Sequence, residues 1–152
     1  MTDPLVFSST TPRHALPMLF PGQAQKEASV NGAHALTDML LHPAVEGEVD
    51  TPPASPADGE CWLVGALPTG LFADKEGCVA GFQHGSWVFA LPRDGMRVFD
   101  RATGQVLVHA GEWRRATAPA IPAAGSTIDQ EARDAIAGLI AALRETGIFP
   151  AQ

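Results

Sequence analysis

The sequence has no tyrosine, only two lysines and only two cysteines among its 152 residues, and each shortage excludes a class of protein. Ten basic residues face seventeen acidic ones, which gives a net charge of −7. Binding to a nucleic-acid backbone needs clustered Lys and Arg, so we expect no nucleic acid as partner. The lack of tyrosine argues against a polar-aromatic binding face of the antibody type.

The shortage of cysteine and of long apolar runs bears on the cellular compartment and on membrane insertion. Cys61 and Cys78 are too few for a disulfide framework and have no CxxC or Cys/His ligand spacing. We expect both to be small buried hydrophobic residues in a reducing compartment. The N-terminus does not resemble a Sec signal, and no apolar run approaches the roughly 20 residues of a membrane span. We expect a protein that is made in the cytoplasm and has no membrane partner.

What is present is a globular composition, with 45% apolar and 18% charged residues. Four prolines divide residues 1–21, which excludes a helix or a central strand because proline fixes φ and has no N–H. This stretch is also too apolar for a solvated tail. We therefore expect residues 1–22 to form an extended arm that lies on its own surface or on a neighbour's, and we favour docking on a neighbouring subunit or on a larger particle. The residues expected to carry this docking are Leu5, Val6, Phe7, Leu19 and Phe20.

Residues 23–113 are expected to form the main domain, a small antiparallel sheet with one helix. Residues 23–41 contain no proline, and Leu36, Met39 and Leu40 have the spacing of one helix face. From residue 60 the apolar period changes to two, and glycine turns separate the strand candidates. These candidates are 60–66, 79–83, 86–91, 96–100 and 105–109. Both faces of 86–91 are apolar, which predicts a central strand.

A weak internal repeat places Trp87 and Trp113 at equivalent positions, each two residues after a glycine turn. The first interpretation is that both tryptophans fill the core. The second is that they form aromatic platforms for sugar rings, which would make the chain a carbohydrate-binding module.

The C-terminal part reads as a linker followed by a helix. Residues 114–126 are rich in Ala and Pro, and residues 127–147 have the pattern of an amphipathic helix. Thr127 to Gln130 fits a capping box, and Gly147 has the position of a C′ cap. One apolar stripe is expected to join identical helices in a homo-oligomer, for which three strands are compatible with the pattern. The stripe consists of Ile128, Ala132, Ile136, Leu139, Ile140 and Leu143. The fold class expected from the whole pattern is α+β.

A search for catalytic chemistry is negative. The sequence has no GxSxG, GxxxxGK[ST], GxGxxG or HExxH motif, so we expect no catalytic residue, no cofactor and no metal. Asp94 and Asp100 flank a predicted strand and are read as turn carboxylates rather than as a glycosidase pair. Five arginines gather in a window of 23 residues, either as a docking patch for an acidic surface or as charges at the rim of a sheet. They are Arg93, Arg97, Arg101, Arg114 and Arg115.

Several short motifs resemble a family of unknown biochemical function found in alphaproteobacterial prophages and gene transfer agents. The resemblance covers about residues 11–115, although the family's helix glutamate is displaced after Asn31 and Leu67-Pro-Thr-Gly70 matches only in part. The motifs are Thr11-Pro-Arg13, Pro21-Gly-Gln-Ala-Gln-Lys-Glu27, Asn31, Thr37-Asp38, Pro52-Pro-Ala-Ser-Pro56, Gly59-Glu-Cys-Trp-Leu-Val64, Gly85-Ser-Trp87 and Pro92-Arg-Asp-Gly95. The family brings no known catalytic residues.

The resemblance implies a component of a phage-like particle, such as a spike, fibre or tail-associated protein, and within that range the base of a head spike. We therefore expect a structural or adaptor subunit that is assembled into the particle and supports attachment to a host surface. Its expected partners are itself and other particle proteins of the capsid, spike or tail. The alternative is a carbohydrate-binding module for host capsular polysaccharide. An enzyme such as a polysaccharide depolymerase is not expected.

Overall fold

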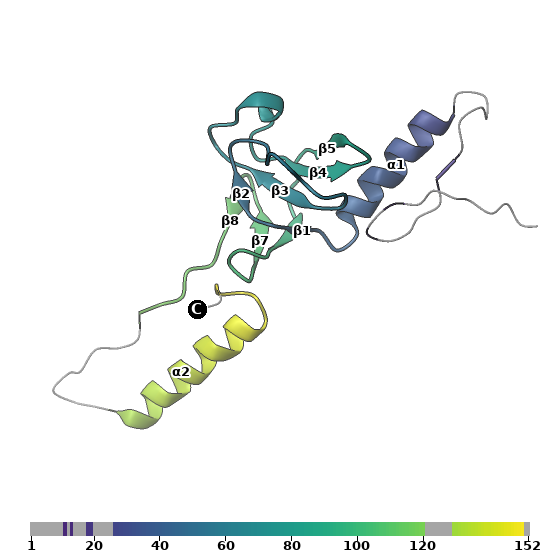
Figure 1. Cartoon of the computed structure of the whole chain (residues 1–152). Helices are drawn as coiled ribbons and strands as arrows, with labels where there is room; N and C mark the ends of the chain where they lie inside the picture. The colour runs from purple at the N-terminus through teal and green to yellow at the C-terminus, as the bar shows by residue number, and fades with distance from the viewer. Residues whose placement is uncertain (1–10, 12, 14–17, 20–25, 121–128, 151–152) are drawn as a thin grey trace, which may run out of the picture. The chain divides into compact units, whose positions relative to one another are not determined.

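The computed structural model describes residues 11, 13, 18, 19, 26–120 and 129–150. Within these residues the strands form two sheets in which antiparallel pairs predominate, and there are two α-helices, α1 (Glu27–Leu40) and α2 (Gln130–Glu145) (Figure 1). The expected α+β class is confirmed. The chain divides into two compact units, residues 1–92 (unit 1) and 93–152 (unit 2). This boundary lies inside residues 23–113, which the sequence pattern predicts to be one domain.

Unit 1 contains α1 and a four-stranded sheet in the order β2-β3-β4-β5. Its strands are β2 (Glu48–Val49), β3 (Cys61–Val64), β4 (Val79–Gln83) and β5 (Ser86–Ala90), preceded by β1 (Ala44–Val45). A short 3₁₀-helix, η1 (Gly70–Phe72), lies between β3 and β4. Strand β2 is parallel to β3, and the other pairs of this sheet are antiparallel.

The strand register gives this sheet two apolar faces. Trp62, Ala80 and Phe89 lie opposite one another on one face, next to Val64. Phe72 of η1 and Cys78 pack onto this face and form a buried cluster with Val64 and Ala80, against which Val49, Trp87 and Phe89 also pack. The other face carries Cys61, Gly81 and Val88, and there α1 contacts β5 (Figure 1).

The prediction that 86–91 is a central strand is wrong. Strand β5 lies at the edge of its sheet, and β3 and β4 are the central strands. Both faces of β5 are apolar because the cluster around Phe72 covers Trp87 and Phe89 while α1 covers the other side. A covered edge strand therefore gives the same sequence pattern as a central one.

Helix α1 lies within the predicted range, and its buried face overlaps the expected one in part. Met39 is buried and Leu40 half-buried as expected, but Leu36 is 36% exposed, and the buried set includes Ala35 and Asp38. The helix approaches β4 at Gly81, where an added Cβ would lie 2.7 Å from the Met39 sulfur atom. Glycine at this position of the strand therefore makes room for the helix.

Unit 2 contains the antiparallel strands β6 (Arg97–Asp100), β7 (Gln105–His109) and β8 (Trp113–Arg114). Val98 and Leu107 face each other across β6 and β7 and are 1% and 0% exposed. The other face of the same strands carries the pairs Arg97–Val108 and Phe99–Val106. The two-residue strands β1, β2 and β8 were not predicted, because two residues show no alternation.

Helix α2 has well-defined ends. Its N-cap is Asp129, whose carboxylate accepts a hydrogen bond from the Ala132 N–H, and the expected Thr127 lies outside the described residues. The predicted C′ glycine is confirmed, since Gly147 has φ +70° and donates to the Arg144 carbonyl. Ile148 donates to the Leu143 carbonyl, which completes a Schellman motif.

Candidate functional site

The buried carboxylate of Asp38 on α1 holds the described part of the N-terminal arm. Asp38 is 2% exposed and accepts a hydrogen bond from the Thr11 hydroxyl at 2.7 Å. Its second oxygen accepts from the backbone N–H of Arg13 at 3.1 Å. Charge-assisted bonds of this kind are stronger than neutral ones, so the arm is fixed to the helix at this point.

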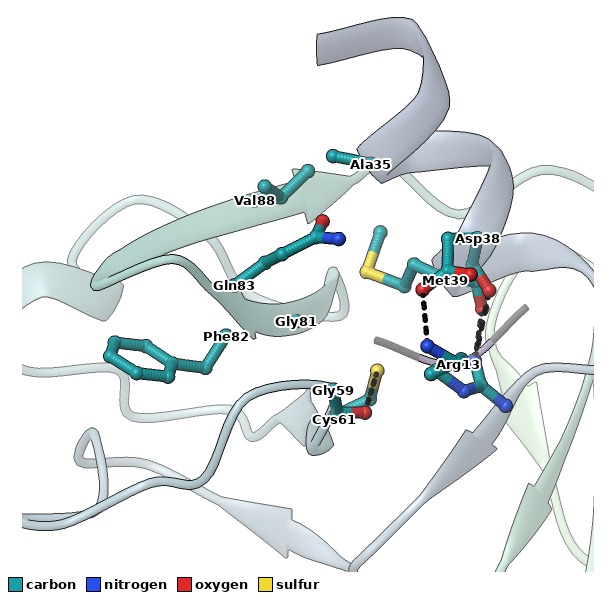
Figure 2. A pocket seen from close by; sticks show the side chains of 10 residues that line it. All are labelled: Arg13, Ala35, Asp38, Met39, Gly59, Cys61, Gly81, Phe82, Gln83 and Val88. Atoms are coloured by element: carbon teal, nitrogen blue, oxygen red, sulfur yellow. Dashed lines mark hydrogen bonds between the residues drawn. The ribbon is translucent and has the colours of Figure 1, made fainter. Parts of the chain in front are cut away.

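Arg13 completes the attachment by capping the C-terminal end of α1. Its guanidinium donates to the carbonyls of Met39 and His42, each at 2.8 Å, and to that of Asp38 at 3.3 Å. Figure 2 shows Arg13 beside Asp38 and Met39. The last carbonyls of a helix have no partner within the helix, and a cation there is also favoured by the helix dipole. We refer to Thr11, Arg13 and Asp38 as the arm clamp.

A second attachment joins the arm to the middle of α1. The Asn31 side chain accepts from the Leu19 N–H at 2.8 Å and donates to the Leu19 carbonyl at 3.0 Å. The described arm residues therefore lie on the helix of their own chain. The other predicted arm-docking residues, Leu5, Val6, Phe7 and Phe20, lie outside the described residues. That the arm docks on a neighbour stays a prediction.

The space beneath the arm clamp is too small for an organic ligand. Figure 2 shows Met39 and the Gln83 amide facing the same interior space, beside Gly81 and Cys61. The cavity there has a volume of about 10 Å³, which has room for at most one water molecule. The cavity is a packing feature of unit 1 rather than a binding site.

The tryptophans proposed as sugar platforms are in packed surroundings. Trp87 makes edge-to-face contacts with Trp62, Phe72 and Phe82, at centroid distances of 5.6, 4.9 and 5.2 Å. Trp113 is half-buried and lies edge-to-face with His109 at 5.2 Å. Trp87 thus contributes to the aromatic packing of unit 1 while staying half-buried. That the two tryptophans bind sugar rings stays an alternative prediction.

The two carboxylates considered for acid–base chemistry have different surroundings and lie apart. Asp94 accepts from the Gly111 N–H at 2.7 Å, and this bond, with a further one from His109, holds the pKa of Asp94 below its ordinary value. Asp100 is buried and pairs with Arg115. Because Asp94 contacts His109 while Asp100 lies opposite Gln105, the length of β7 separates them. That length is about 13 Å, beyond the roughly 5–9.5 Å of glycosidase pairs.

The structure gathers three of the five clustered arginines around one cleft in unit 2, with a volume of about 600 Å³. Arg97 comes from β6, Arg114 from β8, and Arg115 follows β8 directly. The remaining walls come from β7 and from the residues that follow α2. The full lining of this arginine cleft is Arg97, Val106, Val108, Arg114, Arg115, Ala116, Thr146 and Ile148.

The apolar stripe of α2 is largely exposed within the described chain. Ile140 is 5% exposed, but Ile136 and Leu139 are 40% and 60% exposed. Ala132 is exposed and Leu143 half-buried, while Ile128 lies outside the described residues. Unit 2 therefore covers one edge of the stripe and leaves Ile136 and Leu139 at the surface.

Several residues of these sites had no local signal in the sequence. Asp38 appeared only as part of a quoted motif, and its partners lie 25 and 27 positions earlier in the chain. Thr146 and Ile148 join the arginine cleft from a segment about 30 residues after β8, and no pattern within that segment points to the cleft.

A family model described as a protein of unknown function (DUF2793) matches residues 30–114, which is more than half of the chain. The chain therefore belongs to this family. The matched range includes Asn31, Asp38, Arg97 and Arg114, whereas Thr11, Arg13 and α2 lie outside it. No curated protein and no solved structure gave a match. Within the described residues, neither helix has the length and apolar character needed to cross a membrane.

Proposed function

We propose that the chain is a structural adaptor subunit of a phage-like particle, in which α2 joins identical subunits. The observation that carries this proposal is the exposure of Ile136 and Leu139 on α2, whose C-terminal end is hydrogen-bonded to β7. The phage-like setting rests on the motifs named above, from Thr11-Pro-Arg13 to Pro92-Arg-Asp-Gly95.

The spacing of the stripe favours another copy of the same helix as its partner. Ala132, Ile136, Leu139 and Leu143 follow one another at intervals of 4, 3 and 4 residues. This is the interval of a coiled-coil seam, in which each apolar side chain fits between four side chains of the facing helix. The fixed C-terminal end supports the same partner, because an anchored helix loses less freedom when it associates.

The attachment of α2 comes from hydrogen bonds beyond its last turn. The Val106 N–H donates to the Gly147 carbonyl at 2.6 Å, and the Gln105 side chain donates to the Ile148 carbonyl at 3.2 Å. These bonds fix the C-terminal end of α2 on β7, while every residue from Asp129 to Leu139 except Arg133 is exposed. A helix held in this way presents its N-terminal half to neighbouring subunits.

The first experiment measures the oligomeric state of the full chain by sedimentation velocity. We expect the wild type to form a symmetric oligomer and Leu139→Glu to sediment as a monomer, because a charge cannot be buried in an apolar seam. Ala141→Glu is the matched control, since Ala141 is exposed on the opposite side of α2 and the variant should keep the oligomer. A monomeric wild type, or an oligomer that survives Leu139→Glu, would contradict the proposed role of α2.

The second experiment tests the particle itself. Particles from the strain that encodes the chain are purified on a density gradient, and the tagged chain is sought in the particle fraction. We expect the wild type and Ala141→Glu to co-purify with particles and Leu139→Glu to be lost from them. An oligomeric chain that stays out of the particle fraction would contradict the adaptor role while leaving self-association intact.

A further inference from the structure

The arginine cleft is a second surface of unit 2, separate from the seam of α2. We propose that this cleft binds an organic anion, with a carboxylate, phosphate or sulfate group held between Arg97 and Arg114 and the apolar part of the ligand against Val106 and Val108. This inference does not depend on the proposed role of α2, because the two surfaces share no residue.

The strand register places two of the arginines on either side of an apolar strip. Arg97 on β6 lies directly opposite Val108 on β7, and Val108 lies directly opposite Arg114 on β8. Neighbouring strands are about 4.8 Å apart, so the Cα atoms of Arg97 and Arg114 are about 10 Å apart across Val108. Two long guanidinium side chains at this separation can reach one oxyanion from both sides.

These two arginines are not neutralised by strong ion pairs. Arg97 is exposed and has no ion pair with any residue that the structure describes. Arg114 lies 3.7 Å from Glu112, but both side chains are largely exposed, at 64% and 77%. Exposed pairs of this kind are weak and are readily replaced by a better-placed anion. The cleft thus carries positive charge that a ligand can use.

The third arginine is held in place by a buried partner. The Arg115 guanidinium pairs with Asp100, whose side chain is 2% exposed, and the other oxygen of Asp100 accepts from the Ala102 N–H at 2.9 Å. Arg115 is therefore fixed at the edge of the cleft before any ligand arrives. Fixed charges favour binding because less side-chain entropy is lost when the complex forms.

The distribution of charge along the chain leaves unit 2 without a net negative charge that would repel an anion. Seven of the ten basic residues lie in unit 2, against seven of the seventeen acidic ones, so the net charge of −7 belongs to unit 1. The volume of about 600 Å³ lies within the range of about 300–1,000 Å³ that small-molecule sites occupy. The half-buried Val106 and Val108 provide apolar contact that a bare inorganic ion would not use.

The test is isothermal titration calorimetry of the full chain with benzoate, phenyl phosphate and phenyl sulfate, and with benzyl alcohol as the neutral analogue. We expect saturable binding of at least one anion with a Kd of about 1 mM or tighter, and none of benzyl alcohol. The three anions distinguish a carboxylate from a phosphate or a sulfate as the group preferred. Inorganic phosphate should bind more weakly than phenyl phosphate, because it makes no contact with the valines.

Arg97→Gln and Arg114→Gln should each weaken the binding by about tenfold or more. Arg93→Gln is the matched control, since it removes the same charge from an exposed arginine of unit 2 outside the cleft. Equal loss in Arg93→Gln and Arg97→Gln would show a general charge effect and overturn the site. The site would also be overturned if none of the anions binds to the wild-type chain.

Discussion

At the scale of single residues, the buried carboxylate of Asp38 attaches the described arm residues to α1. Asp38 accepts from both Thr11 and Arg13, two residues of the motif near the start of the chain. Arg13 in turn donates to the last carbonyls of α1. The family motif Thr11-Pro-Arg13 and the distant Asp38 thus form one hydrogen-bonded group. Their joint presence in the sequence has a structural explanation that requires no ligand.

Asp38→Asn tests the arm clamp without changing the size of the side chain. The amide replaces one accepting oxygen by an NH₂ group, which would face the Thr11 hydroxyl or the Arg13 N–H, both of them donors. We therefore expect the free energy of unfolding to fall by about 1–3 kcal/mol. Asp58→Asn is the control, because Asp58 is an exposed residue of the same unit and should change stability little. Urea denaturation followed by tryptophan fluorescence measures both. Equal stability of the two variants would mean that the clamp contributes nothing to the fold.

At the scale of elements, glycines show where α1 is tightly packed and where it is not. An added Cβ at Gly81 would lie 2.7 Å from the Met39 sulfur and 3.4 Å from the Cys61 sulfur, whereas at Gly32 nothing lies within 4 Å. The two positions lie on β4 and α1, the two elements that meet at Met39. They therefore report separately on packing and on helix propensity.

Gly81→Ala and Gly32→Ala should change stability in opposite directions. We expect Gly81→Ala to destabilise by about 1–3 kcal/mol, because Met39 must move and the helix shifts from the sheet. Gly32→Ala should stabilise by about 0.5–1 kcal/mol, because alanine restricts the unfolded chain and favours the helix. Thermal and urea unfolding of the two variants measure the difference. A neutral Gly81→Ala would show that α1 does not depend on this close approach.

Elements long enough to show a repeating apolar pattern were predictable from the sequence, and features that depend on distant partners were not. Strands such as Val79–Gln83 and Gln105–His109 match their predicted ranges, because alternation and glycine turns act locally. The position of β5 was missed because the aromatic cluster and α1 cover both of its faces. Of the arginine cleft, the sequence showed the cluster of arginines but not that Thr146 and Ile148 close it.

At the scale of the whole molecule, acidic and basic charge are distributed unevenly between the two units. Unit 1 carries the net charge of the chain, whereas unit 2 is balanced and carries both proposed binding surfaces. One of these surfaces is apolar and the other is lined by arginines. Salt affects such surfaces in opposite ways, because it screens exposed charges and strengthens or leaves unchanged the burial of apolar groups.

The two surfaces of unit 2 should therefore be separable by ionic strength alone. On raising NaCl from about 50 mM to about 500 mM, we expect the α2 oligomer to persist and phenyl phosphate binding to weaken severalfold. Sedimentation velocity and calorimetry on the same samples provide the two readouts. Dissociation of the oligomer at the higher salt would indicate an electrostatic contact between subunits in place of the apolar seam.

The one-sided attachment of α2 also has a mechanical consequence. Its C-terminal end is hydrogen-bonded to β7 through Gly147 and Ile148, and its 16 residues extend about 24 Å from that point. A helix held at one end acts as a lever, so a rotation of about 10° at the anchor displaces the far end by about 4 Å. If α2 joins subunits as proposed, small adjustments near Gly147 would let those subunits match a curved or stepped support while each unit 2 keeps its internal packing.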